Sequence, residues 1–170
     1  MATRGWRPTG RPAIVGTARD HFSAAMDALA PTLLPIAETL LRVWVGLALV
    51  PHGLRMTFGL FPNTGLPVRN LGMLAEQLDR TGWRPGRFWA PAIAFVELVC
   101  GPLVALGLFT RAAAVPVLVF LLVANVERWR VGRYFWNQMG LEYTLMWTLA
   151  AFWVLARGSG PYALDALIGR

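Results

Sequence analysis

The sequence predicts an all-α integral membrane protein: a four-helix bundle with an interfacial amphipathic helix between the first two spans. Hydrophobic residues make up 56% of the 170 residues, and charged residues make up only 15%. The apolar residues also gather in runs of about 20, the length that crosses a bilayer as a helix. A short chain of this composition lacks the polar surface that a soluble domain needs, so lipid is the expected solvent.

Four apolar segments are expected to form the spans. They cover residues 33–58, 88–109, 112–129 and 141–156. A short turn with the sequence GLFTR joins the second segment to the third. So short a connection forces two helices into an antiparallel hairpin.

The connection between the first two spans, residues 59–87, contains an amphipathic segment. Leu71, Leu74 and Leu78 fall on one face of a helix there, while Glu76 falls elsewhere. This pattern is typical of a helix that lies in the plane of the membrane interface. A lid over the mouth of the bundle is the alternative interpretation.

Residues 1–30 precede the membrane domain and differ from it in composition. This stretch is basic and has no early apolar core of the kind that a cleaved signal peptide needs. We expect a basic arm, disordered in part or folded as a surface helix with Phe22, Met26 and Leu29 at helical spacing. Residues 31–170 then form the transmembrane domain.

The net charge is +7, and the chain has arginine but no lysine. The arginines are scattered between apolar runs, so we expect them to contact anionic lipid head groups and not nucleic acid. They divide almost equally between the two sides of the predicted bundle, so the positive-inside rule does not choose an orientation. We place both termini in the cytoplasm because the longer connections then form an outer rim.

Cysteine and histidine are too scarce for most metal or haem sites. The single cysteine, Cys100, excludes an intramolecular disulfide and a cysteine-based metal site. Its apolar surroundings predict a buried core thiol. His21 and His52 are too far apart in the sequence to suggest a pair of haem ligands, and no metal, flavin or nucleotide motif is evident.

Ionisable residues inside the predicted spans are the candidate site, because a charge within a bilayer is costly unless other groups surround it. We assign chemistry to Glu97, His52 and Arg42. Arg42 is the expected partner of Glu97, and His52 can exchange a proton near neutral pH. The other expected pocket residues are Glu38, Trp44, Asn125, Glu142 and Tyr143.

Each of these residues also has a structural interpretation. Glu38 and Arg42 lie four residues apart and can form an ion pair on one helix face. A pair of Arg42 with Glu97 can simply lock two helices together. Glu142 can stabilise the start of a helix through the helix dipole, and His52 can be a hydrogen-bonded structural group.

Four segments, spread over residues 40–170, occur in a characteristic order: LLRVWVGLALVPHGLRMTFG, FVELVCGPLVALGLFTR, LEYTLMW and PYALDALIGR. In this order and spacing they resemble the DoxX family of small bacterial four-helix membrane proteins. The matching residues are Arg42, Gly46, His52, Gly53, Gly59, Glu97, Gly101, Gly107, Thr110, Arg111, Glu142, Tyr143, Leu164 and Asp165. The sequence departs from the family pattern at Met56, where the family often has Lys, and at Pro51.

The resemblance implies a redox-associated protein of the bacterial inner (cytoplasmic) membrane, because one branch of the family resembles the large subunit of thiosulfate:quinone oxidoreductase. We therefore expect a quinone-linked oxidoreductase subunit, with quinone as its cofactor near Glu97, Arg42 and His52. The expected partners are membrane lipids and other membrane or redox proteins, and a homo-oligomer is an option. The alternatives are a non-enzymatic accessory subunit of a larger respiratory or redox complex, and a carrier for small anions or coupled to protons.

Overall fold

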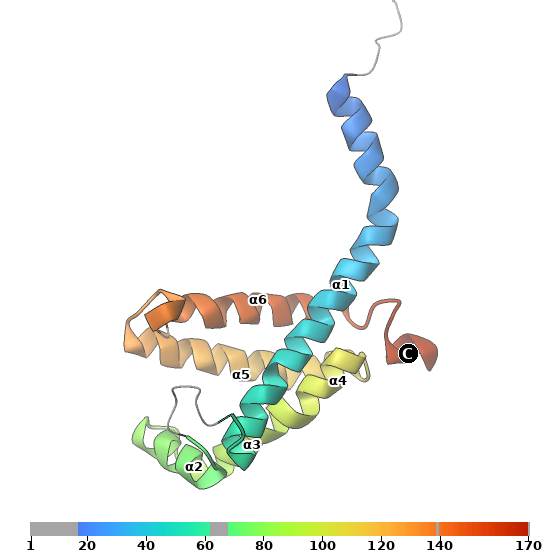
Figure 1. Ribbon diagram of the computed structural model, residues 1–170. Coiled ribbons are helices and arrows are strands. Elements are labelled where there is room, and N and C mark those ends of the chain that lie inside the picture. The colour runs from blue at the N-terminus through green and yellow to red at the C-terminus, as the bar shows by residue number, and fades with distance from the viewer. Residues whose placement is uncertain (1–16, 62–67, 139, 170) are drawn as a thin grey trace, which may run out of the picture. The chain divides into compact units, whose positions relative to one another are not determined.

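The computed structural model describes residues 17–61, 68–138 and 140–169, and the regular elements in these ranges are all helical (Figure 1). The prediction of an all-α protein is therefore confirmed. The chain divides into two compact units, Met1–Leu34 and Pro35–Arg170. The predicted site residues all lie in the second unit.

In the first unit, the described residues form the beginning of helix α1 (Ala18–Phe58). The backbone N–H and the hydroxyl of Thr17 donate to the Asp20 carboxylate at 2.6 and 2.8 Å, which fixes the first turn. An alanine-rich sequence with high helix propensity follows. Residues 18–30 of the expected arm are thus helical and belong to α1. Residues 1–16 lie outside the described residues, so the division into an arm and a membrane domain stays a prediction.

Three helices are long and apolar enough to cross a membrane: α1, a continuous helix over Gly86–Leu106, and α5 (Thr110–Val131). The second of these consists of α3 (Gly86–Phe95), the π-helical turn η1 (Val96–Cys100) and α4 (Gly101–Leu106). The predicted fourth span corresponds to α6 (Leu141–Arg157). At 17 residues, α6 is only about 25 Å long, so a fourth crossing remains a prediction.

Helices α5 and α6 lie side by side (Figure 1). In the second unit, small and branched apolar residues of α1, η1, α4, α5 and α6 form one core. Its buried members are Val45, Leu49, Cys100, Val104, Ala113, Ala114, Val117, Leu121, Ala151 and Val154. Cys100 is a buried free thiol, as its sequence context predicts.

A direct backbone contact joins α1 to the second span. A Cβ atom added to Gly46 would overlap the carbonyl oxygen of Gly101 and lie 2.5 Å from the backbone nitrogen of Ala105. A Cβ atom on Gly101 would in turn lie 2.8 Å from the carbonyl oxygen of Gly46. Only glycine lets two helices approach so closely in a membrane protein.

A second glycine extends this contact along α1. A Cβ atom on Gly53 would lie 2.9 Å from Cβ of Glu97 and 2.7 Å from the side chain of Leu98. Gly46 and Gly53 are seven residues apart, so they face the same side of α1. The two contacts run in opposite chain directions, which makes α1 antiparallel to the second span.

Asp165, just inside the short helix α7 (Leu164–Leu167), holds the turn between α4 and α5. Its carboxylate accepts hydrogen bonds from the backbone N–H groups of Phe109 and Thr110, at 2.8 and 2.9 Å, and from the Thr110 hydroxyl at 2.9 Å. The backbone N–H of Asp165 also donates to the carbonyl oxygen of Gly107. The C-terminal segment therefore caps the beginning of α5.

Arg42 ties α1 to the same turn. One of its terminal nitrogens, Nη1, donates to the carbonyl oxygens of Val104 and Ala105 at 3.1 and 2.8 Å. The other, Nη2, donates to the carbonyl oxygen of Tyr162 at 3.0 Å. These carbonyl groups belong to the end of α4 and to the C-terminal segment, and a cation is favourable at a helix C-terminus.

The amphipathic segment forms helix α2 (Leu71–Arg80), which begins where Asn70 accepts a hydrogen bond from the backbone N–H of Met73 at 2.9 Å. Leu74 is buried in a small apolar cluster with Val68 and Ala90. The apolar face of α2 therefore packs against α3. Its position in a membrane interface remains a prediction.

We predict that Gly46→Ala lowers the Tm of the purified protein by roughly 10 °C, because the added methyl group overlaps the second span and overpacking of this kind costs about 3 kcal/mol. Gly72→Ala is the matched control within helix α2, since its Cβ atom would meet only a side-chain oxygen of Asn70, at 3.2 Å. Thermal unfolding in one detergent measures both variants. Equal Tm values would contradict the proposed contact.

We predict that Asp165→Asn lowers Tm by roughly 6 °C, because an amide NH₂ group facing the N–H donors of Phe109 and Thr110 costs about 2 kcal/mol. Asp27→Asn is the control: Asp27 is exposed and has no hydrogen bond or ion pair among the described residues. The same thermal assay compares the two variants. A Tm loss no larger than that of the control would show that Asp165 does not hold the turn.

Candidate functional site

The second unit contains a cavity of about 480 Å³ where α1, η1, α5 and α6 meet. Most of its wall is apolar or aromatic, and the polar side chains come from several helices. The polar and charged residues that line it are His52, Arg55, Glu97, Arg128, Tyr143 and Thr144. The aromatic ones, besides Tyr143, are Phe120, Trp136 and Trp147. This is the combination expected of a site for an amphipathic ligand.

Glu97 sits in the π-helical turn η1, and its side chain is 1% exposed. The backbone N–H of Gly101 donates to the carbonyl oxygen of Val96, five residues earlier, which is the π-helical pattern. Pro102 follows directly, and because proline has no N–H it cannot complete the α-helical bond to Leu98. Single π-helical turns inside a helix are frequent at functional sites.

The carboxyl group of Glu97 is incompletely satisfied. Its Oε2 atom is buried and has no hydrogen-bond partner among the described residues. Leaving a buried acceptor without a partner costs about 1–3 kcal/mol, and more when the group is charged. Glu97 is also one of the residues that line the cavity, so this oxygen is a candidate acceptor for a donor group of a ligand.

Two arginines bring positive charge to the same cavity. Arg55 lies three residues after His52 on α1, so the two side chains share a helix face. Its guanidinium group is buried and interacts electrostatically with both Glu97 and His52. Arg128 reaches the cavity from the last turn of α5. The cavity thus combines one acid with two cations and an imidazole.

An aromatic wall lies on the α6 side. The rings of Tyr143 and Trp147 are edge to face, with centroids 6.0 Å apart and an angle of 71° between their planes. Trp136 and Phe120 complete this wall. Aromatic side chains of this kind can stack on a planar ligand and supply polar edges at the same time.

Of the residues predicted from the sequence, the structure brings Glu97, His52 and Tyr143 into one cavity. Arg55 and Arg128 were missed because they lie near the expected ends of spans, where arginine usually meets lipid head groups. The spacing of three residues between His52 and Arg55 was the signal that could have identified Arg55. No comparable signal in the sequence connects Arg128 to Glu97.

The expected pair of Arg42 with Glu97 is wrong. The contact of Gly46 with Gly101 sets the register, so Arg42 lies beside Ala105 and the residue beside Glu97 is Gly53. Arg42 is 3% exposed and donates to backbone carbonyl groups, as described above. Its position fits a structural role.

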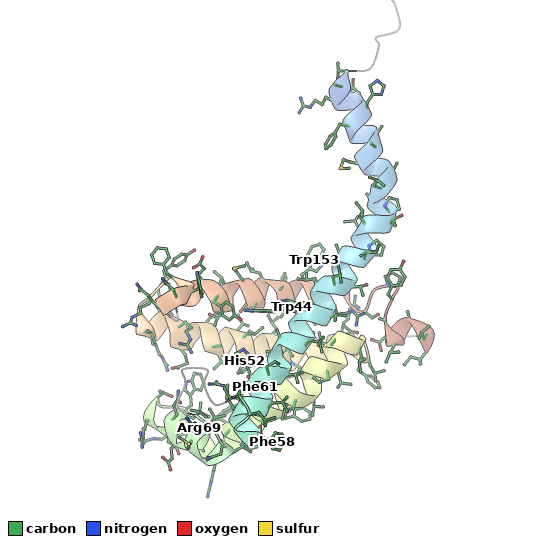
Figure 2. All side chains as sticks on the ribbon, viewed as in Figure 1. Trp44, His52, Phe58, Phe61, Arg69 and Trp153 are labelled. Atoms are coloured by element: carbon green, nitrogen blue, oxygen red, sulfur yellow. The ribbon has the colours of Figure 1, made fainter. Side chains whose placement is uncertain are left out.

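The expected pair of Glu38 with Arg42 is also wrong. Glu38 Oε1 instead accepts from Nε and Nη2 of Arg157, at the end of α6, at 2.8 and 2.7 Å. Trp44 is 64% exposed on the outside of α1, about two turns before His52, and does not line the cavity (Figure 2).

Asn125 and Glu142 make local contacts outside the cavity wall. Asn125 Nδ2 donates to the hydroxyl of Thr148 at 2.8 Å, which joins α5 to α6. Glu142 Oε2 accepts from the backbone N–H of Trp136 at 3.1 Å, close to the start of α6. Within the described ranges, no three His, Cys, Asp or Glu side chains converge as a metal site would require.

Comparison with known proteins places the chain in a family. The profile of the DoxX family matches residues 37–127, which include the Gly46–Gly101 contact, His52 and Glu97. The chain is similar to the uncharacterized membrane protein Rv3486 of Mycobacterium tuberculosis, with 27% identity over 168 residues, 93% of this chain and 94% of that protein. No solved structure matches. Because the profile covers more than half of the 170 residues, the chain belongs to the DoxX family of membrane proteins.

Proposed function

We propose that this protein is a quinone-binding subunit of a redox system in the bacterial inner membrane, with both termini in the cytoplasm. The observation that carries the proposal is the buried Oε2 atom of Glu97, a residue that lines a mostly apolar cavity; in the part of the chain that the structure describes, this atom has no hydrogen-bond partner. A quinone head group suits this cavity because it is planar and apolar, with polar oxygens at two opposite edges. The resemblance to redox-linked members of the family supports the same class of ligand.

The residues of the cavity have distinct tasks in this proposal. The rings of Trp147 and Phe120 offer apolar faces to the head group. Arg55 and Arg128 donate hydrogen bonds to the ring oxygens. In the reduced ligand the oxygens carry hydroxyl groups, and Oε2 of Glu97 accepts from one of them.

A quinone held by these residues would supply two-electron, two-proton chemistry. Arg55 and Arg128 stabilise negative charge on the ring oxygens as the electrons arrive. Glu97 and His52 each pass one proton to a ring oxygen and are reprotonated afterwards. The electrons come from a reduced donor, for which the family resemblance suggests a sulfur oxyanion, oxidised by two electrons either directly or through a partner protein.

We predict that Glu97→Gln weakens binding of a short-chain quinol about tenfold and slows quinol formation further. Glutamine keeps the size of the side chain but presents an NH₂ group or a weaker acceptor, and it carries no acidic proton. Quenching of tryptophan fluorescence in purified protein gives Kd, and absorbance of the quinone in membranes supplied with donor gives the rate.

Glu76→Gln is the control, because Glu76 lies on α2 with 73% of its side chain exposed and makes only a surface ion pair with Arg80. Kd and rate should stay at the wild-type values in this variant. If Glu97→Gln retains both values, Glu97 is not part of the mechanism. Co-purification with other membrane proteins and unchanged turnover would then indicate the non-enzymatic accessory subunit.

A further inference from the structure

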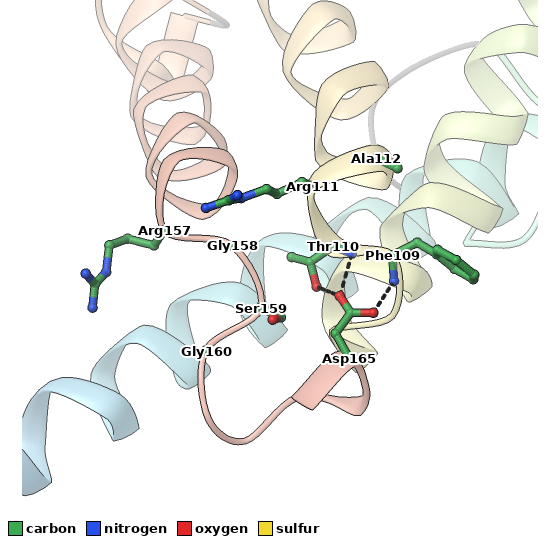
Figure 3. A pocket seen from close by; sticks show the side chains of 9 residues that line it. All are labelled: Phe109, Thr110, Arg111, Ala112, Arg157, Gly158, Ser159, Gly160 and Asp165. Atoms are coloured by element: carbon green, nitrogen blue, oxygen red, sulfur yellow. Dashed lines mark hydrogen bonds between the residues drawn. The ribbon is translucent and has the colours of Figure 1, made fainter. Parts of the chain in front are cut away.

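A second cavity, of about 380 Å³, lies where α5 begins and α6 ends (Figure 3). It has no residue in common with the cavity at Glu97. Its charged and polar wall includes Arg111, Arg157, Ser159 and Asp165, with Gly158 and Gly160 in the loop after α6. Two arginines therefore line one hollow, and Figure 3 shows the side chain of Arg157 pointing away from that of Arg111.

The guanidinium group of Arg111 packs against the backbone of Gly158, at the end of α6. A Cβ atom on Gly158 would lie 3.1 Å from Nε of Arg111, so only glycine leaves full space for the guanidinium group there. Figure 3 shows the side chain of Arg111 extending from α5 towards the end of α6. Among the described residues, Arg111 forms neither a hydrogen bond nor an ion pair.

Two of the three charged residues in the wall of this cavity have a partner of opposite charge, Arg157 in Glu38 and Asp165 in Arg42, which leaves Arg111 without one among the described residues. Asp165 is the acid in its wall, and both of its oxygens already accept hydrogen bonds from Phe109 and Thr110. Arg157 uses Nε and Nη2 for Glu38, which leaves Nη1. Because Asp165 occupies the amides at the start of α5, an anion here would be held by the guanidinium groups.

We propose that this cavity binds a phosphate group, with Arg111 as the main ligand and Arg157 and Ser159 as supporting donors. The planar fork of arginine matches two phosphate oxygens. The cavity lies at the first turn of α5, a helix long and apolar enough to cross a membrane, and the ends of such a helix are expected at the depth of phospholipid head groups. An anionic phospholipid is the principal source of this chemistry, and a soluble phosphate is the other.

Native mass spectrometry of the detergent-solubilised protein tests the proposal. The protein is mixed with equal amounts of phosphatidylglycerol and phosphatidylcholine, and the retained lipids are counted. We expect wild type to retain phosphatidylglycerol preferentially and Arg111→Gln to lose that preference about tenfold, the loss expected for a charge-assisted hydrogen bond. Retention of phosphatidylcholine should be the same in all variants.

Arg133→Gln is the matched control, because it removes the same charge from an exposed position beyond the opposite end of α5. It should keep the preference for phosphatidylglycerol. If both variants lose the preference equally, net charge explains the effect and the site is overturned. If neither loses it, the site is likewise overturned.

Inorganic phosphate separates the two sources. If millimolar phosphate raises the Tm of lipid-stripped wild type but not of Arg111→Gln, a soluble phosphate also binds at the site. Arg111→Lys keeps the charge but not the fork, and we expect lipid retention between those of wild type and Arg111→Gln. The variant is informative if Arg111→Gln fails to fold, because full retention in Arg111→Lys would contradict recognition by the guanidinium fork. Neither measurement depends on the function proposed for the cavity at Glu97.

Discussion

The contact between the backbones of Gly46 and Gly101 determines how α1 meets the second span. Two helices can touch in this way only where both lack side chains, so the contact permits one register and excludes its neighbours. In that register Arg42 lies beside Ala105, and Gly53 lies beside Glu97. The polar contacts of α1 on either side of the crossing follow from this alignment.

On either side of the contact between Gly46 and Gly101, arginine and an acidic residue have different roles. On one side, Arg42 donates to three backbone carbonyl groups and Asp165 accepts three hydrogen bonds, so the C-terminal segment is locked onto the turn between α4 and α5. On the other side, Glu97 keeps one buried oxygen without a hydrogen-bond partner within the described ranges. A cluster with many hydrogen bonds stabilises a fold, even though Nε of Arg42 has no partner among the described residues, whereas an unsatisfied acceptor in a residue that lines a cavity is available to a ligand.

Helix α5 contributes one arginine to each of the two cavities. Arg128, in its last turn, faces the cavity with Glu97, and Arg111, in its first turn, faces the cavity proposed for phosphate. A membrane helix can carry arginine at both ends because each end reaches the level of the lipid head groups. The charge of +7 is thus compatible with an apolar protein that has several of its basic groups near the ends of its helices and buries Arg42 within α1.

Helical structure, the approximate helix ranges and the choice of Glu97 and His52, which the structure places in one cavity, as candidate site residues could be inferred from the residues alone. Hydrophobic length and an acid within an apolar run are local properties. The partners of Arg42 and Glu38, the entry of Arg55 and Arg128 into the site, and the π-helical turn at Glu97 could not. These features depend on which residues of separate helices face one another. That alignment is set by close backbone contact at Gly46, Gly53 and Gly101, and it becomes defined only when the helices pack.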